Sequence, residues 1–435
     1  MSFTQLRRGA SALLPASSVR ALRYPAFRRW AGADAVSQLG TWAQALALSW
    51  VVLELTGSTA ALGLALALQS APQLLLGAWG GALADRLPLR PLVTATQLAQ
   101  AGCAGALAVL AWTGTGTVPL LLLLALLQGL VQVVDGPAHG LFAQQLVPEQ
   151  DLPNAAALGS VTSSGGRVIG MALGGAVLGT VGASWLFAAN AVTFAGVARL
   201  VHRLPADQIR ALPRAEGDSG SVRAGLRYAL GHRALLVLLA LVLVTSSLGR
   251  SFSVTTAALV QGPLGGDAAA YALCSAAFAL GALLGGLLAA RLRTLSLRVV
   301  LASAGLAAVG QVLAAASPTA TVLNALMIPV AGACVVLDTA VGCHLVLDTP
   351  PALRGRVLAL RGLVAAAAGT AGAPLLGAMC EVLGARLTIA GSGLVVLAGV
   401  LAAAVALRLI AVRAGSWTGW LRGRAAGLLP APALS

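Results

Sequence analysis

The chain alternates long apolar segments with short polar connections. Twelve apolar segments have roughly the 20 residues that a helix needs to cross a lipid bilayer. They lie near residues 31–53, 60–84, 92–112, 118–140, 155–180, 183–201, 234–260, 268–290, 298–316, 320–343, 357–380 and 384–407. This pattern predicts an all-α integral membrane protein with twelve transmembrane helices.

Composition supports a membrane protein and argues against a soluble one. Hydrophobic residues make up 58% of the 435 residues, charged residues make up 9%, and the mean hydropathy is +0.89. A water-soluble globule cannot bury so much apolar surface, so lipid is the expected solvent for most of the chain. The net charge of +15 raises the possibility of nucleic-acid binding, but the distribution of the arginines argues against that partner.

Arginine supplies all the basic charge, and 25 of the 28 arginines lie before the first segment, after the last, or in alternate connections between segments. The opposite connections carry only Arg386. Because basic connections stay in the cytoplasm, we expect a multi-pass protein of the inner (plasma) membrane with both termini cytoplasmic. The connection after the fourth segment is an exception, since it holds Glu149 and Asp151 and no arginine.

An internal repeat indicates two halves. The string that ends the second segment, Gly80-Gly81-Ala82-Leu83-Ala84-Asp85-Arg86, recurs without its acid at Gly285 to Leu292. Parallel six-helix repeats joined by a linker fit such a duplication. The predicted organisation is a cytoplasmic N-terminal segment, an N-terminal bundle, a cytoplasmic linker, a C-terminal bundle and a cytoplasmic tail, at residues 1–30, 31–203, 204–232, 233–408 and 409–435.

A charged turn between the second and third segments carries the most specific motif. Its residues Gly81, Leu83, Ala84, Asp85, Arg86 and Arg90 resemble the loop signature of the major facilitator superfamily, with Pro88 in place of the usual second glycine. Shorter pieces resemble its exporter branch, which includes enterobactin exporters and macrolide efflux proteins: Phe27-Arg28-Arg29, Ser37-x-Leu39-Gly40, Leu55-Thr56-Gly57-Ser58 and Arg354-Gly355-Arg356-Val357. The resemblance covers about residues 24 to 408 and implies alternating access between two bundles.

The fifth segment resembles the antiporter motif of exporters. Gly166, Gly170 and Gly174 follow at intervals of four, although the motif's first glycine and its proline are missing. Gly281 and Gly285 form a similar pair in the eighth segment. Small residues let membrane helices approach closely, so we expect these glycines to pack helices, with the two faces meeting across the halves. The alternative is that small residues are simply tolerated there.

Gly81 and the charged residues near the segment ends are candidate gating residues; the charged ones are Asp85, Arg86, Arg90, Asp135, Arg291, Asp338, Arg354 and Arg356. A carboxylate stabilises a helix N-terminus, and the family resemblance nominates the eleventh segment as the one that Asp85 caps. Arg86 and Arg90 are expected to pair with Asp135, and Arg291 or Arg293 with Asp338. In the alternative interpretation, Asp135 and Asp338 bind protons or substrate.

Polar residues inside the segments are candidates for substrate or proton binding, because ionisable groups in lipid are costly without a role. They are Asp34, Gln38, Trp42, Gln44, Gln69, Arg167 and Arg250. Asp34 is the first choice for a protonatable coupling residue, unless it lies at the wet end of its helix. Arg167 is too deep to reach the surface and faces either the cavity or a buried partner such as Gln44 or Asp34.

These observations predict a secondary transporter that exports a hydrophobic or amphiphilic small molecule, such as a drug, secondary metabolite or siderophore, in exchange for protons. Uptake by proton symport and a non-transporting receptor or assembly subunit are the alternatives. ATP use is not expected, since a chain without lysine cannot contain a phosphate-binding Gly-x4-Gly-Lys loop.

We do not expect an enzyme, a catalytic residue, a metal or a cofactor. The four histidines lie in no metal or nucleophile motif and are assigned a surface role, and the five cysteines are interpreted as small core residues. The expected partners are the substrate, protons and the bilayer, with the protein acting as a monomer.

Overall fold

Helices form the described part of the chain. A computed structural model describes residues 16–210, 222–249, 252–292, 295–347, 349–350 and 353–413. Within these ranges twelve spans are long and apolar enough to cross a membrane, which confirms the predicted fold. The long helices of the first half are α2 (Pro25–Thr56), α3 (Thr59–Arg86), α4 (Leu89–Thr113), α5 (Val118–Gln145), α6 (Leu152–Val181) and α7 (Ala183–Arg203). Those of the second half are α9 (Arg233–Ser247), α10 (Phe252–Gln261), α11 (Ala268–Arg291), α12 (Leu297–Ala315), α13 (Ala320–Leu347), α14 (Arg354–Leu383) and α15 (Ala385–Arg413).

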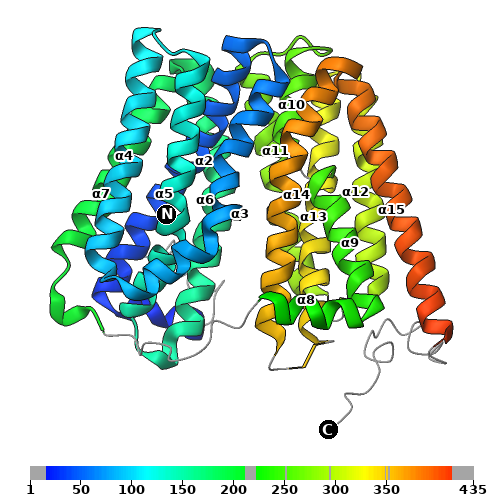
Figure 1. Ribbon diagram of the computed structural model, residues 1–435. Coiled ribbons are helices and arrows are strands. Elements are labelled where there is room, and N and C mark those ends of the chain that lie inside the picture. The colour runs from blue at the N-terminus through cyan, green and yellow to red at the C-terminus, as the bar shows by residue number, and fades with distance from the viewer. Residues whose placement is uncertain are drawn as a thin grey trace, which may run out of the picture. The chain divides into compact units, whose positions relative to one another are not determined.

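Several shorter helices were not predicted. They are η1 (Ala16–Arg23), η2 (Glu149–Asp151), η3 (Ala206–Gln208) and α8 (Val222–Gly231). α8 lies in the predicted linker and runs across the long helices (Figure 1), where it packs against α14 and α9. The seventh span is also not one continuous helix, because α9 ends at Ser247 and α10 begins at Phe252.

The residues before the first predicted segment are part of the fold. The backbone N–H of Ala21 donates to Asn154 Oδ1 at 2.9 Å, and the Tyr24 hydroxyl donates to Asp151 Oδ2 at 2.8 Å. This hydrogen bond and the carboxylate charge raise the pKa of Tyr24, because both favour the protonated phenol. The Ala21–Asn154 bond therefore joins η1 to α6, and Asp151 of the acidic connection after the fourth segment holds Tyr24.

The contacts divide the chain into two compact units. The first contains Met1–Ala47 and Leu75–Ala215, and the second contains Leu48–Leu74 and Glu216–Ser435. The first part of α3 therefore packs with helices from the second half of the sequence. The predicted bundles, which assign residues 31–203 to one repeat, stay a prediction.

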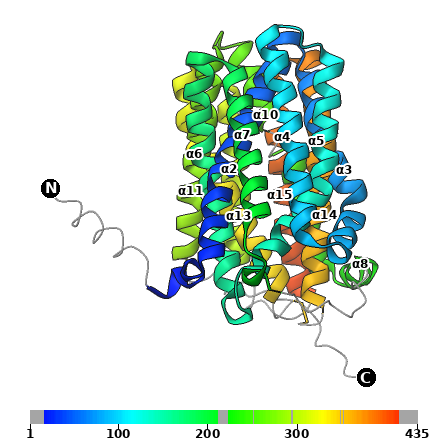
Figure 2. The ribbon, with the colours of Figure 1, turned by 90° about the vertical axis from the view of Figure 1, so that its left-hand side faces the viewer.

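Apolar side chains between neighbouring helices form the core of each unit. In the first unit α4 packs against α7 and α5 (Figure 1 and Figure 2), and Phe27, Trp30 and Phe142 belong to one buried cluster. In the second unit α13 packs against α11 and α12, and α12 packs against α15. Where the chain faces water, burial of apolar surface is the main contribution to the stability of the fold. Within lipid, close packing between helices contributes more to that stability.

The repeated glycines bring helices into contact, but within each unit. A Cβ atom at Gly170 or Gly174 would lie against α2, close to Trp42 or Ala43, and Gly166 lies against Gln38 of the same helix. Gly281 and Gly285 instead face α13, at Ile328 and Gly332. The expectation that the two glycine faces pack on each other is therefore wrong, because each face already contacts a neighbouring helix of its own unit.

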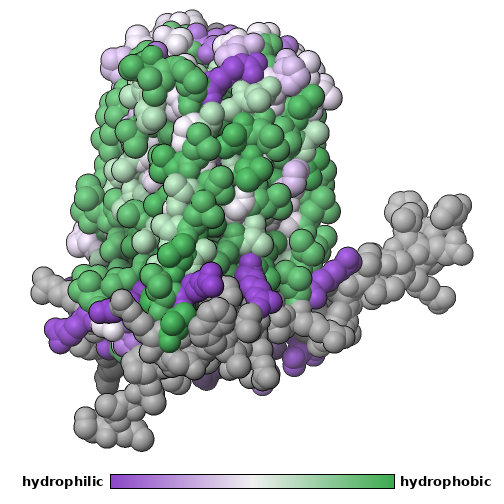
Figure 3. All heavy atoms as spheres, turned by 90° about the vertical axis from the view of Figure 1, so that its right-hand side faces the viewer, coloured by the Kyte–Doolittle hydropathy of each residue, from purple (hydrophilic) through white to green (hydrophobic). Residues whose placement is uncertain are grey.

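The face of the helices shown in Figure 3 is mainly apolar, with hydrophilic residues gathered at its upper and lower edges. Many large apolar side chains are exposed along the helices, among them Leu306, Val395 and Leu401. Such a surface would be unstable in water, but it is the expected one for helices that contact lipid. It supports the assignment as a multi-pass membrane protein.

Candidate functional site

A buried ionisable pair joins α2 to α5 in the first unit. His139 Nε2 lies 2.9 Å from Asp34 Oδ1, with 18% of the histidine side chain and 7% of the aspartate side chain exposed. The Trp30 ring covers the imidazole at a centroid distance of 5.0 Å. The predicted surface role for His139 is therefore wrong. Its partner Asp34 lies on another helix, so the residues next to His139 in the sequence give no sign of the contact.

A second carboxylate lies one helical turn from the imidazole. Asp135 precedes His139 by four residues on α5, so the two side chains share a face. Thr96 Oγ1 donates to Asp135 Oδ1 at 2.5 Å, and Gln97 Nε2 donates to both carboxylate oxygens at 3.1 and 3.0 Å. Among the described residues, His139 Nδ1 is buried with no hydrogen-bond partner. The site therefore contains two carboxylates and a histidine that has hydrogen-bonding capacity to spare.

Arg86 and Arg90, the predicted partners of Asp135, do not pair with it. Asp135 is held by α4 side chains rather than by Arg86 or Arg90, and Arg90 Nη2 donates to the backbone oxygen of His202. Two neutral donors from α4 reach Asp135 because α4 and α5 pack directly against each other.

In the second unit, Asp338 pairs with Arg361 of α14, with 3.1 Å between Nη2 and Oδ1. Arg293 lies outside the described residues, so its predicted pair with Asp338 stays a prediction. Arg361 reaches Asp338 because α13 and α14 pack together, whereas Arg291 is exposed at the end of α11.

Polar residues form a continuous face along α2. Asp34, Gln38 and Trp42 follow at intervals of four, which places them on one side of the helix. Gln38 Nε2 donates to Asp34 Oδ1 at 3.4 Å. The Arg167 guanidinium from α6 lies over the Trp42 ring, 4.9 Å from its centroid, within the range of a cation–π contact. We call Asp34, Gln38 and Trp42 the α2 polar stripe, and it connects the Asp34–His139 pair to Arg167.

The glycines of α6 explain how Arg167 reaches this stripe. Gly166 and Gly170 allow the α6 backbone to approach α2, so the intervening Arg167 extends alongside Trp42. Arg167 is about 22 Å from the start of α6 at 1.5 Å per residue, which agrees with its predicted depth.

Other predicted binding residues have different surroundings. Gln44 Oε1 accepts a hydrogen bond of 2.8 Å from the buried Asn190, so it joins α2 to α7. Because Gln44 bonds Asn190 and Asp34 bonds His139, the alternative that Arg167 pairs with either of them is wrong. Gln69 lies half-buried in the second unit, and Arg250 lies outside the described residues.

The charged turn of the sequence motif is exposed. Asp85 and Arg86 end α3 with exposed side chains, while Gly80, rather than Gly81, makes the close contact with Val133 of α5. The N-cap residue of α14 is Leu353, whose own side chain makes no capping hydrogen bond. Capping of this terminus by Asp85 stays a prediction.

The arginines beside the N-terminus of α14 have their own roles. Arg354 Nε donates to Thr349 O at 3.1 Å and so ties the start of α14 to the preceding connection. Arg356 is half-buried, and its gating role also stays a prediction.

A seam between α3 and α14 in the second unit was not predicted. Glu381 accepts hydrogen bonds from Ser58 Oγ and from the backbone N–H of Ala60, the latter at 3.1 Å. Thr370 Oγ1 donates to Ser70 Oγ at 3.0 Å further along the helices. We call this contact, from Ser58 to Ser70 on α3, the α3–α14 seam.

Glycines allow the two helices of the seam to touch. A Cβ atom at Gly63 would overlap the backbone of Ala373, and one at Gly377 would overlap the backbone of Thr59. The Thr59 hydroxyl instead donates to Gly377 O at 2.8 Å. The seam therefore consists of direct backbone contact with polar links at both ends, of the kind that holds membrane helices together.

The comparisons with known proteins agree with this architecture. The sequence profile of the transmembrane secretion effector family matches residues 16–417. A staphyloferrin A transporter from Staphylococcus aureus (strain NCTC 8325 / PS 47) is 26% identical over 183 residues, which are 40% of this chain and 46% of that protein. The chain thus matches less than half the length of that relative.

Solved structures of transporters share the fold. A bacterial homologue of the human lysosomal transporter Spinster superposes with a TM-score of 0.67 at 15% identity, over 94% of this chain and 99% of that one. A D-xylose–proton symporter superposes with a TM-score of 0.65 at 14% identity, over 86% of this chain and 96% of that one. The POT family transporter PepTSo superposes with a TM-score of 0.69 at 11% identity, over 88% of this chain and 98% of that one. By its sequence profile and its fold, the chain belongs to the transmembrane secretion effector family of the major facilitator superfamily.

Proposed function

We propose that this transporter exports a hydrophobic or amphiphilic small molecule in exchange for protons. The observation that carries the proposal is the α2 polar stripe, which links a buried Asp34–His139 pair to the Arg167–Trp42 contact within one unit. Asp34 and Trp42, the ends of the stripe, are eight positions apart on α2, or about 12 Å at 1.5 Å per residue. Protonation of the Asp34–His139 pair therefore occurs close enough to change the electrostatic potential at the Arg167–Trp42 contact.

The Asp34–His139 pair supplies the proton site in this proposal. An imidazole is the side chain that changes charge near neutral pH, and two carboxylates within reach stabilise its protonated form. The second repeat has no histidine at the corresponding position, because Gly342 stands four residues after Asp338 where His139 stands after Asp135. One proton per cycle through the first unit is the simplest stoichiometry.

Arg167 and Trp42 supply the substrate contact. The guanidinium binds carboxylate or carbonyl oxygens through its donors, and the indole stacks on flat apolar groups. A molecule with one polar or anionic end and an apolar body fits this combination. For exchange, proton and substrate must exclude each other: proton binding at the Asp34–His139 pair releases the substrate from Arg167 and Trp42, and proton loss restores substrate binding.

Alternating access requires the α3–α14 seam to open and close. With basic connections in the cytoplasm, Ser58 and Glu381 lie toward the outside and the Asp85 turn lies toward the cytoplasm. The seam then closes the outer end of the pathway. Capping of the α14 N-terminus by Asp85 would close the inner end.

Transport into sealed membrane vesicles tests the proposal. The panel contains lipophilic cations, macrolides and siderophores including staphyloferrin A, each with and without an imposed pH gradient. Arg167→Ala is expected to reduce gradient-driven transport of the substrate about tenfold or more, since a hydrogen bond to a charged group contributes about 1.5–3 kcal/mol. Arg199→Ala, which changes an exposed arginine of α7, serves as the control. If neither the pH gradient nor the Arg167 substitution changes the transport rate of any compound, the proposal is excluded. Accumulation of a compound in the direction of proton flow would indicate symport.

Removing the carboxylate of Glu381 should loosen the seam. Loss of a helix cap costs about 1 kcal/mol, or about fivefold in a two-state equilibrium. In a background without native cysteines, a cysteine at Ser70 should react about fivefold faster with a membrane-impermeant maleimide when Glu381→Ala is added. Glu54→Ala removes another exposed carboxylate at the same end and should leave the rate unchanged. Equal rates in both variants would show that Glu381 does not hold the seam closed.

A further inference from the structure

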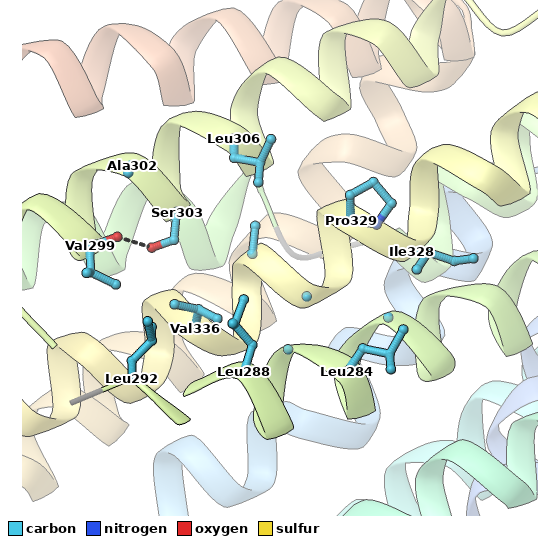
Figure 4. Close-up of a pocket in the computed structure, with 14 residues that line it drawn as sticks. Leu284, Leu288, Leu292, Val299, Ala302, Ser303, Leu306, Ile328, Pro329 and Val336 are labelled. Carbon is cyan, nitrogen blue, oxygen red and sulfur yellow. Dashed lines mark hydrogen bonds between the residues drawn. The ribbon is translucent and has the colours of Figure 1, made fainter. Parts of the chain in front are cut away.

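A groove at the surface of the second unit contains no residue of the α2 polar stripe or of the α3–α14 seam. Helices α11, α12 and α13 enclose a space of about 500 Å³ (Figure 4). Leu284, Leu288 and Leu306 form its sides and are 49%, 53% and 54% exposed. The groove is therefore open at the surface.

The lining of the groove is apolar. The Ser303 hydroxyl is its polar side-chain group, and it donates to Val299 O at 2.6 Å within α12. Its floor lies where Gly281 and Gly285 bring α11 against α13, at Ile328 and Gly332. A hydrocarbon chain fits such a lining, because no polar group of the groove needs a partner from the occupant.

The length of the groove matches one leaflet of a bilayer. Along α11 it extends from Gly281 to Leu292, or about 17 Å at 1.5 Å per residue. Half of the hydrocarbon core is about 15 Å thick. One end of the groove thus lies near the bilayer midplane and the other at the headgroup level.

Two exposed arginines flank the headgroup end. Arg291 is the last residue of α11 and Arg298 is the second residue of α12, and both side chains are exposed. Leu292 and Val299, which adjoin them in sequence, line the groove. Guanidinium groups bind phosphate oxygens in pairs of hydrogen bonds, and basic residues at the cytoplasmic surface attract anionic lipids.

We propose that this groove binds one anionic phospholipid of the cytoplasmic leaflet, with an acyl chain between α11, α12 and α13 and its phosphate at Arg291 and Arg298. The site uses the orientation in the membrane inferred above, but it is independent of the transported substrate and of proton coupling.

Photocrosslinking in nanodiscs tests the proposal with the full-length protein. The probes are phosphatidylglycerol and phosphatidylcholine that carry the same diazirine-labelled acyl chain. Phosphatidylglycerol should give about tenfold more adducts in residues 281–306 and 328–336, as expected for two arginines at a membrane surface. Arg291→Ala with Arg298→Ala should reduce these adducts to the phosphatidylcholine level. Ala302→Phe, which fills the exposed groove wall, should remove adducts of both lipids.

Matched variants separate this site from general lipid contact. Arg199→Ala with Arg203→Ala removes two exposed arginines from one end of α7, and Ala402→Phe enlarges an exposed alanine of α15. Both should leave the groove adducts unchanged. Equal labelling by the two lipids would overturn the proposal, as would adducts that persist in either groove variant. A groove that held the substrate or a second copy of the chain would give these contradictory results, whereas transport by the same variants tests the proposed function separately.

Discussion

Replacing Asp34 with asparagine is expected to reduce proton-driven transport about 100-fold, since a positioned proton-transferring group contributes at least this much. Asparagine keeps the size of the side chain and a hydrogen bond to His139, but it carries no negative charge. His139→Gln should have a similar effect, and the double variant should be no worse than either single one, because the two residues act as a unit. The measurement is substrate accumulation in proteoliposomes under an imposed pH gradient.

Substrate exchange without a gradient separates lost coupling from lost folding. Both variants should still exchange labelled for unlabelled substrate at equal concentrations, with affinity within about twofold of the original protein. Asp207→Asn makes the same chemical change at an exposed position of η3 and should leave all rates unchanged. Accumulation that persists in Asp34→Asn would show that the proton is carried elsewhere.

Locking the α3–α14 seam with a disulfide should stop transport almost completely. The hydroxyl oxygens of Ser70 and Thr370 are 3.0 Å apart, so cysteines at these positions are close enough for the short Cβ separation of a disulfide. In a protein without its five native cysteines, oxidation of Ser70→Cys with Thr370→Cys should abolish transport. Reduction should restore it, because the cross-link is then broken while the fold is retained.

Each single cysteine variant is the control for the lock. Oxidation of Ser70→Cys or Thr370→Cys alone should leave transport unchanged, since neither can form the cross-link. A cross-linked double variant that transports normally would show that the seam stays closed throughout the cycle, and alternating access would then have to occur elsewhere.

Much of the fold follows from the sequence because lipid imposes a simple rule. Each apolar segment of sufficient length satisfies its backbone as a helix, so twelve spans were predictable. The residues at which the helices begin and end were harder to predict. Arg28 and Arg29 interrupt the apolar pattern, yet α2 begins at Pro25 because Phe27 and Trp30 are buried. α8 was not predicted because it lies outside the apolar segments.

The candidate site was predictable only in part. An acid inside a span is conspicuous, so Asp34 was identified, and the glycine spacing around Arg167 indicated a closely packed helix. His139 was missed because its partner lies 105 residues away, a separation that no local pattern reveals. Glu381 was missed as a seam residue for the same reason, since its contacts lie at the start of α3.

The glycine stripes show a further limit of the sequence. Their spacing predicts close helix packing, but the identity of the neighbouring helix depends on how the spans are arranged. Gly170 and Gly285 therefore indicated that a contact exists without indicating that α2 and α13 supply it.

The central claim is that the Asp34–His139 pair moves a proton against the substrate, and the pH inside proteoliposomes tests it most directly. With a pH-sensitive dye enclosed and no gradient imposed, adding the substrate outside should make the interior more alkaline, because a proton leaves as each substrate molecule enters. Asp34→Asn should show no change in pH. Substrate entry into vesicles of the original protein with no alkaline shift, or with acidification, would contradict the account.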